Sequence, residues 1–147
     1  MEARIYNYLL LALLAASPVG EELVSIPLGF YQGLPILPEA LVSMLFNFLP
    51  AAVILAAARA GENNPSALRF VNFFRRERAM KLVEKYGPWG VALLSPLAGV
   101  YSMTVCAWVL GMGKTRILAY TLAGLAAYAA VVCVLLLGGA KLFARFS

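Results

Sequence analysis

Apolar runs of membrane length alternate with short polar breaks along this chain. Two runs, residues 39–60 and 117–137, are long enough to cross a bilayer as helices, because about 20 apolar residues span the hydrocarbon layer. Two further regions, 6–37 and 89–110, are apolar but interrupted by proline and glycine. The pattern predicts an all-α integral membrane protein with two spanning helices and two broken hairpins.

The first interrupted region turns at Ser17-Pro18. Residues 6–16 cover about 16 Å as a helix, which is roughly half of the hydrocarbon layer. Residues 23–37 continue apolar and are predicted to form the return limb of a re-entrant hairpin. A signal peptide is the alternative, because Arg4 precedes an apolar core that ends in small residues.

The two halves of the chain resemble each other at a shift of 78 positions. The shift places Ser17-Pro18 on Ser95-Pro96 and Gly33 on Gly111, and a span follows each pair. Since one crossing separates the two starts, the halves are predicted to form an inverted repeat. We therefore expect a single membrane domain over 1–147, with repeat 1 at about 4–60, an amphipathic linker helix at about 66–86 and repeat 2 at about 87–138.

The linker interleaves aromatic and aliphatic residues with cations: Arg69, Arg75, Arg76, Arg78, Lys81 and Lys85. This composition favours an interfacial helix that binds anionic membrane lipids rather than nucleic acid. Residues 59–116 hold nine of the twelve Lys and Arg residues, so the positive-inside rule places this segment in the cytoplasm and both termini outside. The expected location is the cell membrane, multi-pass, in a prokaryotic plasma membrane.

The composition limits which catalytic and metal-binding sites the chain can form. The chain is 63% hydrophobic, has no His, and its seven acidic residues are all Glu. These features remove the usual metal ligands and most acid–base catalytic sets. We expect no enzyme, no metal and no cofactor.

The hexad Ser17-Pro18-Val19-Gly20-Glu21-Glu22 places two carboxylates inside apolar sequence. Ionisable groups at membrane depth are costly and mark functional sites, so Glu22 is predicted to respond to protons, with Glu21 secondary. A wet loop between two ordinary helices is the alternative.

Ser17 and Ser95 each precede a proline, as an N-cap precedes the first helical position. Each is predicted to start a half-helix whose N-terminus suits an anion such as a phosphate. The candidate substrate or proton site comprises Glu21, Glu22, Ser17, Pro18, Asn47, Ser95, Pro96, Gly99 and Tyr101. For Tyr101, ordinary packing is the alternative.

Three stretches of the sequence are similar to one known family. Residues 22–29 read ELVSIPLG, similar to its E-L-R-G-A-I-P-L-G, and 84–90 read EKYGPWG, similar to its E-K-Y-G-x-W-G. Asn47 with Pro50 is the third. Residues 96–101, PLAGVY, stand where the family has P-L-P-G-T-G, and Val24 replaces its arginine. Over about 17–132 the chain resembles the small multidrug export proteins, relatives of the DedA and VTT membrane proteins.

The resemblance implies two facing re-entrant hairpins and transport of a substrate across the membrane. DedA relatives are linked to proton-dependent movement of lipid-carrier phosphates, and VTT relatives to lipid scrambling. We expect a proton-linked translocase of an anionic lipid or lipid-carrier phosphate. A small multidrug exporter and an accessory subunit without transport activity are the alternatives. Gly and Ala in residues 122–130 offer a close-packing surface, so a homo-oligomer is expected.

Overall fold

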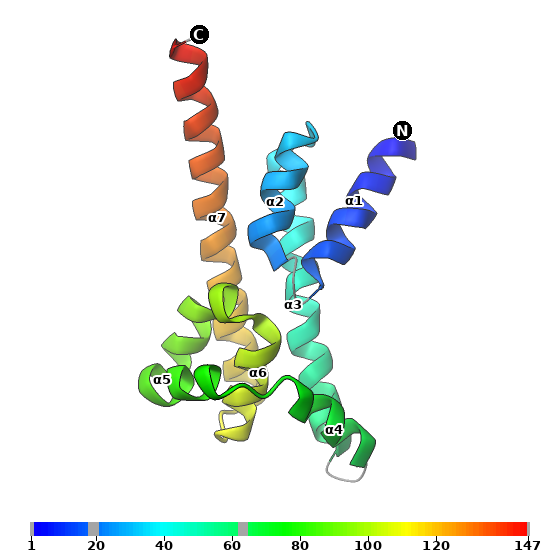
Figure 1. Cartoon of the computed structure of the whole chain (residues 1–147), viewed down its shortest axis with the longest axis vertical. Coiled ribbons are helices and arrows are strands. Elements are labelled where there is room, and N and C mark those ends of the chain that lie inside the picture. The colour runs from blue at the N-terminus through cyan, green and yellow to red at the C-terminus, as the bar shows by residue number, and fades with distance from the viewer. Residues whose placement is uncertain (1, 18–20, 62–64, 147) are drawn as a thin grey trace. The chain divides into compact units, whose positions relative to one another are not determined.

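The computed structural model describes residues 2–17, 21–61 and 65–146, and the side chains of 5–17, 23–59, 65–66 and 69–139 within them. These residues form seven helices and no strand (Figure 1). The helices are α1 (Glu2–Ala15), α2 (Glu21–Tyr31), α3 (Ile36–Gly61), α4 (Pro65–Phe73), α5 (Glu77–Ala98), α6 (Val100–Val109) and α7 (Lys114–Phe146). The all-α prediction is confirmed for the described residues.

The chain divides into two compact units. Unit 1 comprises Met1–Asn47 and Ala126–Ser147, and unit 2 comprises Phe48–Leu125. Helices α3 and α7 each contribute residues to both units. In unit 1, α1 and α2 pack on each other, and a small core joins Ile26 and Ala40 to Ala129 and Cys133 of α7. In unit 2, α5 packs on α6.

Helices α3 and α7 are the two long apolar helices of the described chain. Their apolar windows run over Ile36–Arg59 and Lys114–Gly139, 24 and 26 residues. At about 1.5 Å per residue, each exceeds the ~30 Å hydrocarbon layer. Only 39% and 22% of these windows are buried within the chain, so much of their apolar surface is free to face lipid. The two predicted spans are confirmed in length and composition.

Helices α2 and α6 end in the same way, at positions 78 residues apart. Gly33 and Gly111 both adopt positive φ, 74° and 80°. The Leu34 N–H donates to the Gly29 carbonyl, and the Met112 N–H donates to the Ala107 carbonyl. In both copies this bond closes a Schellman motif, which needs a left-handed residue that glycine supplies without strain.

The helix boundaries follow the same shift of 78 positions. Tyr31 ends α2 and Val109 ends α6, while Ile36 begins α3 and Lys114 begins α7. The two copies therefore share the order short helix, glycine cap and long apolar helix. Their inverted orientation and the re-entrant hairpins stay predictions.

The predicted N-cap role of Ser95 is wrong. Ser95 lies inside α5, fully buried, and its hydroxyl donates to the Val91 carbonyl. A buried Ser satisfies its hydroxyl in this way within its own helix. The chain breaks four residues later, at Gly99, with φ 92° and ψ 125°. The corresponding prediction for Ser17-Pro18 lies partly outside the described residues, because 18–20 are not described.

The segment 66–86 also differs from prediction. It contains two helices, α4 and the start of α5, separated by residues 74–76. The Phe74 ring packs on Tyr101 with centroids 4.7 Å apart, and Arg76 is extended at φ −125°, ψ 135°. This aromatic contact with α6 and the extended Arg76 accompany the break in the amphipathic helix. Helix α5 then kinks at Gly87, with φ 56° and ψ −137°, near the predicted start of repeat 2.

A close contact between α5 and α7 in unit 2 lies one turn before Pro96. A proline in a helix removes the N–H that would bond the carbonyl four residues earlier, which here belongs to Ala92. Gly124 of α7 lies directly against that Ala92 carbonyl, and a Cβ at position 124 would overlap its oxygen. The absence of a side chain at Gly124 allows this close approach.

We expect Gly124→Ala to destabilise the protein by about 1–3 kcal/mol, because an added methyl in a tight contact forces the backbone to shift. The measurement is thermal unfolding in one detergent. Gly138→Ala is the matched control in the same helix, because nothing lies within 4 Å of a Cβ there, and it should melt at or above the wild-type temperature. Equal melting of Gly124→Ala and wild type would contradict the contact.

Candidate functional site

Three polar residues follow one face of α3. Glu39, Ser43 and Asn47 are spaced by four residues, and each is completely buried. Leu37, Leu41 and Leu45 alternate with them and are 54–68% exposed. Because residues two apart in a helix point in nearly opposite directions, the polar side chains face the protein while the leucines face outward.

A short hydrogen-bond chain joins α2 to this face. The Ser25 hydroxyl donates to the Ser43 hydroxyl oxygen at 2.8 Å, and the Ser43 hydroxyl donates to Glu39 Oε1 at 2.6 Å. Both serine protons are thereby committed in the direction of the carboxyl. The chain of donors ends on Glu39.

Gly29 of α2 makes the space that the Glu39 side chain occupies. A Cβ at position 29 would lie 2.5 Å from Glu39 Cγ and 2.9 Å from Glu39 Cδ. It would also lie 3.1 Å from Leu11 Cδ1 of α1. The Glu39 side chain therefore packs directly against α2, and Leu11 of α1 lies beside the same glycine, all within unit 1.

Part of this polar face has no hydrogen-bond partner among the described residues. The unpartnered atoms are Glu39 Oε2 and both polar atoms of Asn47, Oδ1 and Nδ2. Buried polar groups without partners are costly, and each one calls for an explanation. Among the side chains that the structure describes, Glu39 is the one charged residue that is fully buried. In a helix long enough to span a membrane, such a residue indicates a functional site.

Of the residues predicted from the sequence, Asn47 belongs to this site. The backbone of Glu21 and Glu22 begins α2, but their side chains lie outside the described part of the chain. Ser17 follows α1, and its hydroxyl donates to the Leu14 carbonyl at 2.7 Å. Pro18 is not described.

The other predicted residues belong to unit 2. Ser95 and Pro96 are buried within α5, and Gly99 forms the break before α6. Tyr101 is half-buried and packs its ring on Phe74, in line with the packing alternative. The structure thus places Ser95, Pro96 and Gly99 within or at the end of a helix, and Tyr101 in an aromatic contact.

Sequence reasoning missed Glu39 as a site residue. It opens the span directly after Pro38, where an acidic residue is readily interpreted as the polar end of a membrane helix. The spacing was the available signal: Glu39, Ser43 and Asn47 form an i, i+4, i+8 series that alternates with leucines. Such a series is a polar stripe on an otherwise apolar helix.

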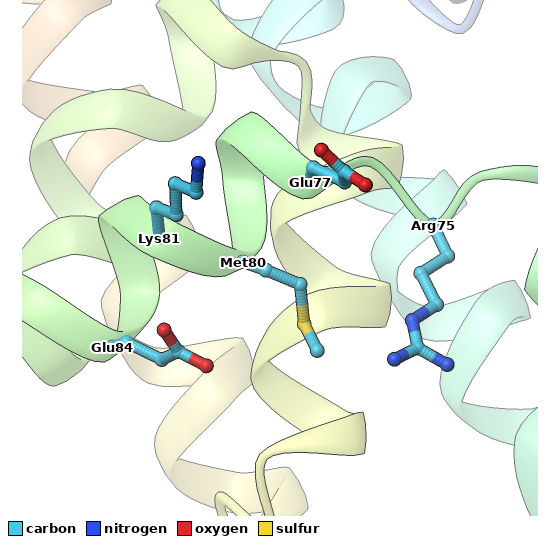
Figure 2. Close-up of a pocket in the computed structure, with 5 residues that line it drawn as sticks. All are labelled: Arg75, Glu77, Met80, Lys81 and Glu84. Atoms are coloured by element: carbon cyan, nitrogen blue, oxygen red, sulfur yellow. The ribbon is translucent and has the colours of Figure 1, made fainter.

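A hollow on the surface of unit 2 is of a different kind. Arg75, Glu77, Met80, Lys81 and Glu84 line it (Figure 2). Lys81 and Met80 point in opposite directions from α5 (Figure 2), and the four charged residues are exposed. Two cations and two anions in contact with water leave little net field. The lining therefore gives the hollow no strong preference for a ligand of either charge.

We expect Ser43→Ala to destabilise the protein more than Ser25→Ala. Ser43 accepts from Ser25 and donates to Glu39, so its loss leaves two buried groups without their partner, at about 1–3 kcal/mol for each. Loss of Ser25 leaves the Ser43–Glu39 bond in place. Thermal unfolding of the two variants in one detergent gives the order, and the reverse order would contradict the network.

Comparison with known proteins gives one match, over residues 21–132. These residues match the family model described as "Putative small multi-drug export protein". No curated protein and no solved structure matches the chain significantly. The match confirms the resemblance seen in the motifs, whereas the relation to DedA and VTT proteins stays a prediction. The matched segment includes the complete polar face from Ser25 to Asn47, and the chain belongs to the small multi-drug export protein family.

Proposed function

We propose that this protein is a proton-linked membrane exporter in which Glu39 carries the proton. The observation that carries the proposal is the fully buried carboxyl with one unpartnered oxygen on the inner face of a helix of membrane length. Family membership supports export as the activity. The proposal moves the proton site from Glu22, the sequence-based candidate, to Glu39.

The surroundings of Glu39 suit a group that gains and loses a proton. An ionised carboxylate is costly to bury unless a cation or several donors stabilise it, and here one donor, the Ser43 hydroxyl, is described. A proton on Oε2 removes that cost. Release of the proton then requires water or another ligand at the same oxygen, which links protonation to opening of the site.

The lipid-phosphate reading has less support. It rested on the resemblance to DedA and VTT proteins and on half-helix N-termini at Ser17 and Ser95 aimed at an anion, and Ser95 lies within α5 instead. The fully buried charge among the described side chains is acidic. We therefore place small-molecule export before translocation of an anionic lipid. An accessory subunit would tolerate loss of the Glu39 carboxyl, so flux measurements separate it from both.

The shared local structure of the two copies supports an inverted repeat as the architecture of the exporter. Each copy would contribute a short-helix hairpin and one span, in a multi-pass arrangement in the cell membrane. Ala123, Ala126, Ala127 and Ala130 are exposed on α7 and follow an i, i+3, i+4, i+7 pattern. Small residues let helices approach closely in lipid, which supports homo-oligomerisation along this surface.

We expect Glu39→Gln to abolish proton-linked flux while leaving the fold intact. Glutamine keeps the volume and the acceptor for Ser43 but cannot release a proton. The assay uses proteoliposomes with a pH indicator inside, to which either ethidium, as a cationic probe, or a short-chain polyprenyl phosphate, as an anionic probe, is added. Proton movement that depends on either probe in the wild type, and is absent in the variant, supports the proposal.

Two further variants complete the experiment. Glu84→Gln changes an exposed glutamate of α5 and should leave flux unchanged. Glu22→Gln tests the carboxyl predicted from the sequence, and wild-type pH dependence in that variant removes Glu22 from the mechanism. Wild-type proton flux in Glu39→Gln would exclude Glu39 as the proton carrier.

A further inference from the structure

The structure also indicates which chemical class the site accepts, an inference that rests on the proposed export function. We propose that the polar face of α3 binds a small organic cation with N–H donors, of the ammonium or guanidinium class, in exchange for the proton on Glu39. The charge of the site, its unpartnered atoms and its titratable neighbours all favour a cation.

The uncharged surroundings of Glu39 favour a cationic ligand. The described residues shown to adjoin the Glu39 side chain are neutral: Ser43 donates to it, Ser25 donates to Ser43, and Gly29 lies against its stem. The neighbouring core of Ile26, Ala40, Ala129 and Cys133 adds no cation. In a medium of low dielectric, a bound anion would repel the carboxylate or require it to stay protonated, whereas a cation stabilises the ionised form.

The unpartnered polar atoms of the site also favour a ligand with N–H donors. The Ser25 and Ser43 hydroxyl protons are already donated within the network. The unpartnered atoms that remain are two acceptors, Glu39 Oε2 and Asn47 Oδ1, and one donor group, Asn47 Nδ2. A ligand that brings N–H donors satisfies Glu39 Oε2, whereas an oxyanion offers that oxygen no donor. Asn47 lies about 12 Å further along the helix and is a separate polar position on the same face. Donor-rich cations therefore complement this face.

Titratable neighbours do not compete with Glu39 for this role. Unit 1 places Tyr6 and Tyr8 on α1, Tyr31 on α2, and Tyr128 and Cys133 on α7. Phenols and thiols lack a positive form, so none can act as counter-ion to the carboxylate. The side chains of Glu2, Arg4, Glu21, Glu22, Lys141 and Arg145 are outside the described part of unit 1.

The exchange balances in charge and atoms. The resting site holds a neutral carboxylic acid, and arrival of one monovalent cation displaces one proton to water. The product is a carboxylate paired with the cation, so the net charge of the site is zero before and after. Cation affinity must then rise by about tenfold for each unit of pH over the range in which Glu39 is protonated.

Three probes of similar size and different charge test the class: phenylguanidinium, phenylurea and benzoate. Binding is measured by calorimetry on the full-length protein in lipid nanodiscs, at several pH values and in buffers of different protonation enthalpy. We expect phenylguanidinium to bind with release of up to one proton, and the other two probes not to bind at the same concentrations. Binding of benzoate, or binding of phenylguanidinium that is independent of pH, would overturn the proposal.

Variants assign the effect to Glu39. Glu39→Gln should lose proton release and at least about tenfold in cation affinity, whereas Glu84→Gln should match the wild type. Glu39→Asp keeps the charge on a shorter side chain, and it should retain proton release at reduced affinity even if Glu39→Gln folds poorly. Unchanged proton release in Glu39→Gln would overturn the assignment.

This binding experiment is separate from the flux assay. If polyprenyl phosphate drives Glu39-dependent proton flux but phenylguanidinium does not bind, the proposed proton role stands and the cation class is wrong. If phenylguanidinium binds with proton release but no probe drives Glu39-dependent flux, the class is right and the export function is wrong.

Discussion

The rotational position of α3 is the constraint on which the rest of unit 1 depends. Lipid provides no hydrogen bonds, so a helix that carries Glu39, Ser43 and Asn47 must turn that face toward protein. The exposed leucines at positions 37, 41 and 45 stabilise the same orientation from the other side. With α3 in this position, α2 places Ser25 against the Ser43 hydroxyl and Gly29 against the Glu39 side chain.

The two copies of the repeat share their backbone but not their chemistry. At the shift of 78 positions, Ile117 and Thr121 take the places of Glu39 and Ser43, and all four are fully buried. The glycine caps and helix boundaries are kept in both copies. Helix ends depend on backbone conformation, which glycine sets locally, so the two halves share their helix ends and differ in these buried side chains.

The sequence predicted the helices better than the site. Long apolar runs and the glycines at 33 and 111 determine spans and caps through local physics, so both could be recognised without a structure. The N-cap role of Ser95 was predicted wrongly, because a serine before a proline has the same local pattern whether it caps a helix or lies within one. Glu39 was missed because its importance comes from the neighbours Ser25 and Gly29, which belong to another helix. Tertiary contacts of this kind are not written in the spacing of one segment.

The contact between Gly29 and Glu39 has a consequence for how such a protein changes over generations. A larger residue at position 29 collides with the glutamate stem, so it is accessible only after position 39 has first become smaller or has changed its course. Replacement at 39 meets a different obstacle, because the buried Ser43 hydroxyl donates to the Glu39 carboxyl. Position 39 is thus coupled to position 29 by volume and to position 43 by a hydrogen bond, so a change at position 39 alters the surroundings of two helices at once.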